Sequence, residues 1–353
     1  MAPTDVDDAV GRLTALWADS VPTVVVGDGA LPPGDGDSGA GAVVISTERL
    51  TRVVDLDRES SALIAQAGAT VGSVREAASS IGLWCPPLRW LPAATSIGAA
   101  LAGAHGRRSR AHGTVADHVL GTGFVCPAVG LARHGGKAIK NASGFHLSAA
   151  LAGSRGELGV ILDVTLRLVP VPGHRAARCF RFPSAELAFE RVRGLAETSL
   201  EAAAVELSVR PDSNSAWILV EVEDSFLGNV ERRLDRLTDR AIQLGGQIDD
   251  SAAWPAAPPG GAAARRASVD PKRFSAIGHQ LIAVCQEHLI SGSIVAEATG
   301  GAVEARLAAH SAEGMAAIAR LFPSPADRAD SNVLHHLLKS AFDPNGLLRQ
   351  RSN

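Results

Sequence analysis

The segment from Gly135 to Ile161, GGKAIKNASGFHLSAALAGSRGELGVI, has residue types suited to binding a ligand through the backbone. Its glycines fall at the turns, and little side-chain bulk surrounds them. Glycine has no Cβ, so such a backbone can approach a ligand closely. Two other stretches share this character, GDGAL at 27–31 and TSIGAALAGAHG at 95–106. Without wider context, the first stretch is also typical of a surface turn. The second is also typical of a helix of small residues packed on a sheet, so the spacing of the glycines alone is only suggestive of ligand binding.

Several other chemistries find no support in the sequence. No GxGxxG follows a strand and opens a helix, and no GxSxG is present, which argues against a Rossmann dinucleotide site and a serine hydrolase. The four cysteines are far apart, form no metal-ligand spacing and are expected to be buried free thiols, and no metal site is predicted. The histidines are isolated, as structural or exposed histidines usually are.

Composition limits the class of protein. The 353 residues favour two domains, and 46% hydrophobic with 20% charged residues is typical of globular chains. A net charge of -3 with interspersed charges predicts no nucleic-acid partner. The first twenty residues begin acidic and are predicted to form an amphipathic helix rather than a signal peptide. No apolar run approaches the roughly 20 residues that cross a bilayer, so no direct membrane insertion is expected.

The elements that must position the glycine-rich stretches are predicted from periodicity and turn residues. In the N-terminal half, β-like runs lie on both sides of the first glycine loop, Thr70 begins a helix, and a hairpin-like pair precedes the 135–161 segment. Pro170, Pro172 and Gly173 mark a boundary, beyond which strands and helices start again. The stretch 253–268 has the composition of a mobile loop, and Thr299-Gly300-Gly301 is predicted to turn a hairpin.

These patterns predict an α+β fold in three parts. Residues 1–172 form the first domain, with subdomains of about 1–57 and 58–172, residues 173–330 form a second α+β domain, and residues 331–353 form a C-terminal helix and tail. No internal repeat of short period is evident.

The string GGKAIKNASGFHLSAALAGSRGELGVILDVTLRLVP resembles the GG-x-x-x-KN-x-x-GYDL…GS-x-G-x-LG-[VI]…T-L-[RK]-L-x-P run of the vanillyl-alcohol-oxidase, or PCMH-type, FAD-binding family. The resemblance is closest to the FAD-binding E subunit of glycolate oxidase. A second segment, SIGAALAGAHGRRSRAHGTVADHVLG at 96–121, is similar to that family's IGG…GPRR…G-x-x-RD-x-VLG segment. The resemblance implies a two-part PCMH-type FAD-binding domain followed by a smaller, ferredoxin-like α+β cap.

The resemblance also implies which residues hold FAD. Backbone amides of two loops would wrap the pyrophosphate, as amide nests do without a lysine. A third segment would lie near the ribityl chain and flavin ring, and a fourth would hold the adenine and ribose through main-chain contacts. In that order, the four sets are Gly27, Asp28, Gly29, Ala30 and Leu31; Thr95, Ser96, Ile97, Gly98 and Ala99; His112, Gly113, Thr114 and Asp117; and Gly153, Glu157, Gly159, Val160 and Ile161.

The sequence departs from the family at three places. The first loop has Val26-Gly27-Asp28-Gly29-Ala30 where Arg-Gly-x-Gly-Thr is usual, which removes a cation and a hydroxyl. Because the Asp28 carboxylate would be repelled by the pyrophosphate, its side chain should face solvent. Phe145-His146 replaces Tyr-Asp, and Ala99 replaces a glycine. Neither the first loop nor residues 92–99 contain the His or Cys that covalent attachment needs, which predicts non-covalent FAD.

The resemblance implies an FAD-dependent oxidoreductase subunit that oxidises the CH–OH group of a 2-hydroxy acid, such as glycolate or D-lactate, or relays its electrons. Such a substrate calls for a carboxylate clamp and a base, and Arg210, Arg273 and His279 are cap candidates by type and place. No Gly-Glu-His-Gly-type cluster of the catalytic subunits is found. The implied partners are a catalytic flavoprotein and an iron–sulfur subunit.

The implied location is cytoplasmic, with any contact to the inner membrane face made through partners. Two alternatives stay open. One is a standalone flavin oxidase or dehydrogenase of specialised metabolism. The other is a non-catalytic scaffold that has lost FAD, suggested by the altered first loop.

Overall fold

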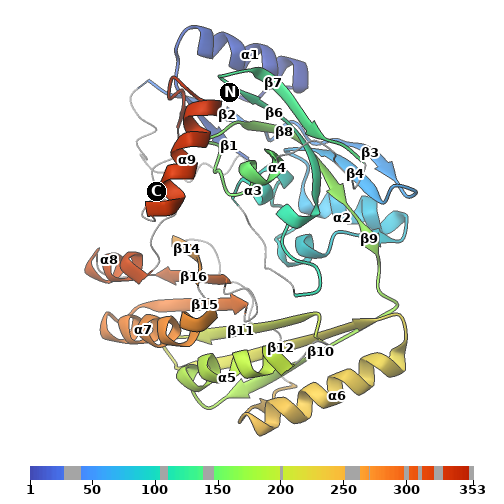
Figure 1. The fold of residues 1–353 in the computed structure, drawn as a ribbon, viewed down its shortest axis with the longest axis vertical. Coiled ribbons are helices and arrows are strands. Elements are labelled where there is room, and N and C mark those ends of the chain that lie inside the picture. Colours follow the sequence, from blue (N-terminus) through green and yellow to red (C-terminus); the bar gives the residue numbers. More distant parts are fainter. Residues whose placement is uncertain are drawn as a thin grey trace. The chain divides into compact units, whose positions relative to one another are not determined.

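A computed structural model describes residues 1–27, 41–103, 110–137, 147–198, 202–250, 263–269, 271–297, 302–308, 312–321 and 329–349 (Figure 1). The chain divides into two compact units. The first unit contains residues 1–106, 113–171 and 330–353, and the second contains residues 107–112 and 172–329. The C-terminal segment therefore packs with the beginning of the chain.

The first unit holds two main sheets. A parallel sheet has the strand order β17-β1-β2, and an antiparallel sheet has the order β3-β4-β8-β6-β7. Helices α2, α3 and α4 pack against strands of the antiparallel sheet (Figure 1). The elements are α1 (Val6–Ala18), β1 (Thr23–Val26), β2 (Val43–Ser46), β3 (Val53–Asp57), β4 (Ala62–Gln66), α2 (Val71–Ser80), β5 (Leu83–Trp84), η1 (Pro86–Trp90), α3 (Ile97–Ala102), η2 (Ala116–His118), β6 (Val119–Cys126), β7 (Gly130–Gly135), α4 (Leu147–Leu151), β8 (Val160–Arg167), β9 (Val169–Pro170), α9 (Ala329–Phe342) and β17 (Leu348–Arg349).

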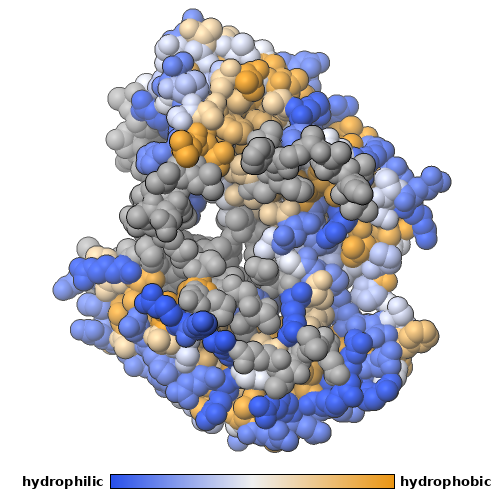
Figure 2. Space-filling view, in the orientation of Figure 1, coloured by the Kyte–Doolittle hydropathy of each residue, from blue (hydrophilic) through white to orange (hydrophobic). Residues whose placement is uncertain are grey.

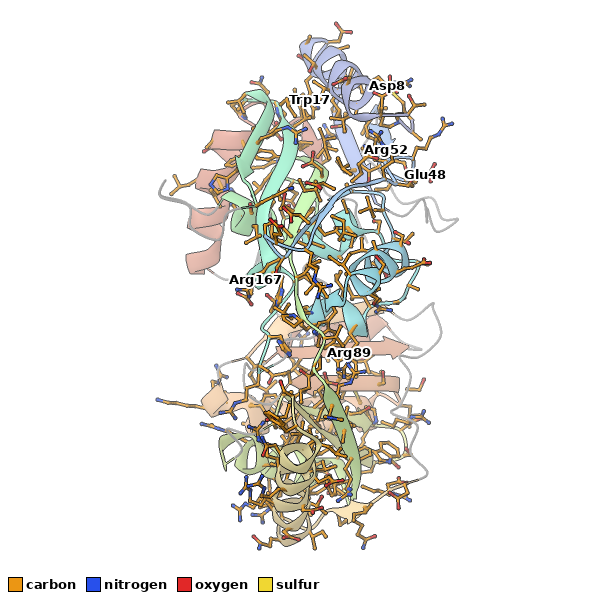
Figure 3. All side chains as sticks on the ribbon, turned by 90° about the vertical axis from the view of Figure 1, so that its right-hand side faces the viewer. Asp8, Trp17, Glu48, Arg52, Arg89 and Arg167 are labelled. Carbon is orange, nitrogen blue, oxygen red and sulfur yellow. The ribbon has the colours of Figure 1, made fainter. Side chains whose placement is uncertain are left out.

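Helix α1 forms where the amphipathic pattern predicts it. The Asp5 side chain caps the helix by accepting a hydrogen bond from the Asp8 amide. Leu13 and Trp17 are buried, and Trp17 donates its indole N–H to Thr23 Oγ1 at 3.1 Å on β1. Asp8 is nine residues from Trp17, half a turn out of phase, and its side chain projects from the other side of the helix (Figure 3).

The second unit is a seven-stranded sheet of order β13-β10-β12-β11-β15-β16-β14, in which every neighbouring pair is antiparallel. Apolar side chains on one face of its strands share a core with α5, α6 and α7. The outer side of α6 is charged, and Figure 2 shows a largely hydrophilic surface over that helix. The elements are β10 (His174–Phe182), α5 (Ala185–Thr198), β11 (Ala204–Arg210), β12 (Ser215–Asp224), α6 (Leu227–Gln243), β13 (Gln247–Ile248), β14 (Ala263–Ser268), η3 (Pro271–Arg273), α7 (Phe274–Glu287), β15 (Ser291–Glu297), β16 (Ala302–Ala308) and α8 (Ala312–Leu321).

The order of elements in this unit repeats itself. The first half runs β10-α5-β11-β12-α6-β13, and the second runs β14-α7-β15-β16-α8. The two halves join where β11 pairs with β15, which are corresponding strands. The repeat is about 90 residues long, beyond the short periods that typical solenoid repeats have.

One predicted element differs from the structure. Residues 253–268 were predicted to be a loop, but 263–268 form β14, which pairs with β16. This strand lacks β-branched and aromatic residues, so its pairing rather than its propensity defines it. Strands β15 and β16 pair as the predicted hairpin requires, and their connecting residues lie outside the described part.

The four cysteines are free and buried, as predicted. Burial raises the pKa of Cys85 and of Cys285 to about 12 and that of Cys179 to about 11. Among the described residues, no helix is long and apolar enough to span a membrane.

Candidate functional site

The first and second glycine loops meet at Gly27, the residue that follows β1. A Cβ on Gly27 would lie 2.8 Å from both Ala99 Cβ and Ser96 Oγ. Real Cβ atoms do not approach so closely, so only glycine lets β1 lie against the start of α3. Residues Asp28, Gly29, Ala30 and Leu31 of the predicted first loop lie outside the described residues.

The second loop, Thr95–Ala99, is held by its own hydrogen bonds. The Ser96 side chain caps α3 by accepting from the Ala99 amide at 3.2 Å. The amides of Ile97 and Gly98 donate to the carbonyls of Ala69 and Ala67 at 2.8 and 2.7 Å, and that of Thr95 donates to Pro92.

These bonds change the prediction of an amide nest in this loop. Four of its five amides donate within the protein, because α3 is anchored to the strand that ends at Gln66. The Ser96 amide has no acceptor among the described residues, and Ser96 is buried. The second loop therefore supplies one amide for a ligand, and the rest of it forms a rigid support beneath Gly27.

The 153–157 segment packs against the two elements that adjoin these loops. The amides of Gly153 and Arg155 donate to the last carbonyls of α3, those of Leu101 and Ala102, at 3.0 and 2.8 Å. Gly156 has a φ of +83°, and a Cβ there would lie 3.1 Å from Val25 Cβ on β1. The first two predicted FAD segments are therefore in direct contact at Gly27, and this segment contacts the strand before the first and the helix that continues the second.

Ser154 is a residue of this segment that the sequence prediction missed. Its hydroxyl is buried and has no hydrogen-bond partner among the described residues. Buried hydroxyls are nearly always paired, so this one is suited to a ligand oxygen. Its place in the Gly-Ser pair of the motif was the available signal.

The predicted residues Gly159, Val160 and Ile161 begin β8 and are buried in the protein. Val160 and Ile161 pair with Val125 and Phe124 on β6, and their side chains lie in hydrophobic cores. A Cβ on Gly159 would lie 3.0 Å from the Phe124 ring. The structure gives these three residues a packing role.

The predicted segment 112–117 forms a turn that an aspartate stabilises. Asp117 Oδ2 accepts from the Thr114 amide at 2.7 Å and from its hydroxyl at 2.8 Å. Gly113 has a φ of +74°, and a Cβ there would lie 2.5 Å from this oxygen. His112 belongs to the second unit, where its Nε2 lies 2.7 Å from Glu223 Oε2. The structure thus divides this segment between the units.

The three cap candidates are separated within the second unit. Arg210 is exposed at the end of β11. Arg273 occupies the N-cap position of α7 without a side-chain capping bond, and Nε2 of His279 on that helix lies 3.2 Å from the Glu186 carbonyl and 3.7 Å from Glu190 Oε1. Helix α7 packs on the apolar face of the sheet, so His279 and Arg273 belong to the helical layer.

The opposite face of this sheet buries polar side chains that the sequence prediction missed. Glu206 on β11 pairs directly with Glu297 on β15, and they are 1% and 3% exposed. Ser208 and Ser293 lie on the same face by strand alternation, and neither buried hydroxyl has a hydrogen-bond partner within the described part of the chain. Arg210 is on this face too. The sequence AVELSVR shows the alternation but not the burial.

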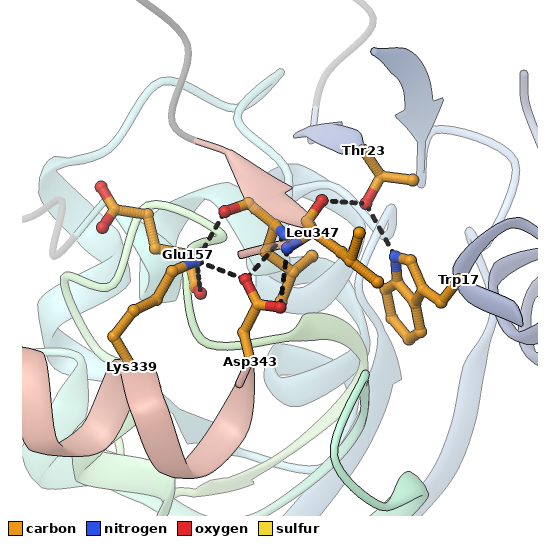
Figure 4. Close-up of polar contacts among 7 residues, drawn as sticks. Trp17, Thr23, Glu157, Lys339, Asp343 and Leu347 are labelled. Carbon is orange, nitrogen blue, oxygen red and sulfur yellow. Dashed lines mark hydrogen bonds and ion pairs between the residues drawn. The ribbon is translucent and has the colours of Figure 1, made fainter. Parts of the chain in front are cut away.

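The residues of the first unit fit FAD. The close approach at Gly27, the buried Ser96 amide and the unpaired Ser154 hydroxyl are features that a phosphate- and hydroxyl-bearing cofactor would complete. Lys339 reaches this region as well, since its Nζ donates to the Glu157 carbonyl at 2.7 Å (Figure 4).

Comparison with known proteins gives the same cofactor. Residues 1–134 match a family model described as an FAD binding domain. A D-lactate dehydrogenase of Archaeoglobus fulgidus is 32% identical over 232 residues, which cover 64% of this chain and 52% of that protein. The glycolate oxidase subunit GlcE of Escherichia coli is 30% identical over 177 residues, covering 48% of this chain and 47% of that protein.

The fold also matches solved structures. An alkyldihydroxyacetonephosphate synthase superposes with a TM-score of 0.74 at 14% identity, covering 100% of this chain and 76% of that one. The chain spans about half the length of the curated relatives named above. The resemblance found in the sequence is confirmed: FAD is the cofactor, and residues 1–134 are similar to an FAD binding domain.

Proposed function

We propose that the chain is an FAD-dependent oxidoreductase subunit that acts on the CH–OH group of a 2-hydroxy acid, or relays electrons from that reaction, with FAD bound non-covalently. The observation that carries the proposal is the convergence of Gly27, Ser96 and the 153–157 segment in a domain of the FAD-binding family. Relatives named D-lactate dehydrogenase and glycolate oxidase subunit support the substrate class.

In this proposal the first unit holds the cofactor. Gly27 and the residues after it approach the pyrophosphate, and Ser96 donates its amide there. Ser154 offers its hydroxyl to the ribose or phosphate, while Gly113 and Asp117 fix the turn assigned to the flavin end. FAD, when bound, accepts a hydride from the carbon that bears the hydroxyl.

We further propose that the second unit is the ferredoxin-like cap. Its first half has the βαββαβ order of elements and the sheet order β13-β10-β12-β11, which are those of that fold. The polar face of its sheet would bind substrate. The Cα atoms of Arg210 and Glu206 are about 13 Å apart, because a strand rises about 3.3 Å per residue. The long side chains could thus flank a small hydroxy acid, with Arg210 on its carboxylate, Ser208 between, and Glu206 accepting the hydroxyl proton.

The proposed partners are a catalytic flavoprotein and an iron–sulfur subunit, in a cytoplasmic complex that reaches the inner membrane face through them. The relatives named as glycolate oxidase subunits support a multi-subunit assembly.

The test is purification of the full chain with and without co-expressed partners. We expect a yellow protein whose flavin is released by acid and whose absorbance bleaches on addition of glycolate or D-lactate, alone or only in the complex. Bleaching of the isolated chain would exclude a pure relay. A chain that stays colourless in excess FAD would contradict the whole proposal.

A further inference from the structure

The C-terminal helix and strand form a buried polar cluster that touches the proposed cofactor segments. Lys339 Nζ donates three hydrogen bonds, to the Glu157 carbonyl at 2.7 Å, to Asp343 Oδ2 at 2.7 Å and to the Leu348 carbonyl at 2.5 Å (Figure 4). An ammonium has three donors, so all three are used. The acceptors come from the 153–157 segment, from the residue that follows α9 and from β17.

Asp343 completes the cluster from the other side. Its side chain is fully buried, and its two oxygens accept from the amides of Leu347 and Leu348 at 2.8 Å each. Without Lys339 this carboxylate would be a buried charge with no cation beside it among the described residues, which is strongly unfavourable. The pair therefore holds residues 347–348 in one position.

Strand β17, which this pair holds in position, is paired with β1. Leu348 pairs with Thr23 in a parallel register, and the Thr23 amide donates to the Leu347 carbonyl at 2.7 Å. Three residues beyond Thr23, β1 ends and Gly27 begins the first glycine loop. Lys339 thus touches one proposed FAD segment directly and fixes the strand that leads into another.

We infer that Lys339 and Asp343 are positioning residues for FAD, and that FAD binding and docking of the C-terminal segment 339–349 are thermodynamically coupled. This rests on the proposed assignment of residues 27 and 153–157 to the cofactor. If the docked segment raises FAD affinity by some factor, bound FAD must favour docking by the same factor. The cofactor site then depends on residues more than 180 positions away from Glu157.

The experiment uses the full chain and two variants, Lys339→Met and the double variant Lys339→Met/Asp343→Asn, which leaves no unpaired charge. FAD affinity is measured by flavin fluorescence during titration of the apoprotein. We expect the dissociation constant to rise about tenfold in both variants, equivalent to about 1.4 kcal/mol. In the wild type, FAD should also slow hydrogen exchange at the amides of Leu347 and Leu348, and this protection should be lost in both variants.

Two controls separate positioning from general stability. Arg12→Met removes another ion pair of i,i+4 spacing in the same unit, with Asp8 on the exposed side of α1, and should leave FAD affinity unchanged. Leu63→Ala removes a fully buried side chain of that unit and should lower the melting temperature of the apoprotein while residues 347–348 keep their FAD-dependent protection.

The outcomes are distinct. A wild type that binds no FAD defeats the proposed cofactor site itself. A wild type that binds FAD, with variants that bind it equally tightly, defeats the coupling. If both variants fail to fold, the wild-type exchange measurement decides, because the absence of FAD-dependent protection at Leu347 and Leu348 also overturns the inference.

Discussion

In the first unit, the groups proposed to bind the ligand belong mainly to the backbone, and glycines let the segments that carry them come together. In the second unit, the corresponding groups are side chains on neighbouring strands: Glu206 opposite Glu297, with Ser208 and Ser293 on the same face. A backbone site depends on local turns and small residues. A side-chain site on a sheet depends on strand register, which long-range pairing defines.

This difference fits a division of labour. FAD is constant, and main-chain contacts suit a constant ligand because they tolerate changes of side chain. A substrate is recognised by particular side chains, and a sheet face presents them at fixed spacing. We therefore expect substitutions in the first unit to alter the affinity for FAD, and substitutions on the sheet face of the second unit to alter substrate selectivity.

The largest expected effect comes from Phe189→Ala in the second unit. Phe189 is 1% exposed and packs against the Phe274 ring, with centroids 5.5 Å apart. Its removal should cost about 3–5 kcal/mol of unfolding free energy. Calorimetry should show a lower melting temperature, whereas FAD titration should give the wild-type affinity.

The matched change in the first unit is Phe124→Ala. Phe124 is also 1% exposed and stacks on Phe342 at 5.8 Å. The Phe124→Ala substitution should lower both the free energy of unfolding and the affinity for FAD. If the Phe189 variant loses FAD as severely as the Phe124 variant, the division of labour is wrong.

The cysteines can report each unit separately, because Cys85 and Cys126 lie in the first and Cys179 and Cys285 in the second. Their raised pKa values and burial keep the reactive thiolate rare while the units are folded. FAD at about 100 times its dissociation constant should stabilise the first unit by about 2.7 kcal/mol. Labelling of Cys85 and Cys126 should then slow by about a hundredfold, as followed by mass spectrometry of the labelled peptides.

Cys179 and Cys285 should be labelled at the same rate with and without FAD. Equal slowing of all four thiols would show that the chain opens as one cooperative body, and no slowing would show that FAD does not bind the first unit.

Gly27→Ala tests the close approach at the start of the first loop. A Cβ there would overlap Ala99 and Ser96, so the loop must shift, at a cost of about 2 kcal/mol, or about thirtyfold in FAD affinity. Gly11→Ala is the control, because a Cβ at Gly11 meets nothing within 4 Å. Equal affinities for FAD in the two variants would remove Gly27 from the site.

The sequence predicts the first unit better than the second for a physical reason. The N-cap at Thr70 and helix α1 are local patterns, and the structure forms them where they were predicted. The resemblance of the string beginning at Gly135 to the family's motif predicted that the cofactor is FAD. The sequence could not show that the amides of Ile97 and Gly98 are already occupied, because their acceptors, Ala69 and Ala67, belong to a different element.

The structural features that the sequence did not predict depend on contacts between residues far apart in the chain. Lys339 contacts Glu157 across 182 positions, and nothing in HHLLKSAFD at 335–343 predicts that partner. Strand β14 has weak strand propensity and forms by pairing with β16. The polar residues of β11 show the alternation of a half-exposed strand, and only the structure shows that both faces are buried.

The smallest expected effects come from a matched pair of serines, one in each unit. Ser154 and Ser208 are buried, and neither hydroxyl has a hydrogen-bond partner in the part of the chain that the structure describes. Leaving a buried hydroxyl unpaired is unfavourable, so Ser154→Ala and Ser208→Ala should each stabilise the apoprotein by about 1 kcal/mol, measured by urea denaturation. Their effects on binding should differ: Ser154→Ala should weaken FAD, and Ser208→Ala should lower kcat/KM for the hydroxy acid with FAD affinity unchanged. If both variants are more stable and neither loses affinity or activity, these hydroxyls serve no ligand, and the contrast between a backbone site and a side-chain site loses its support in the second unit.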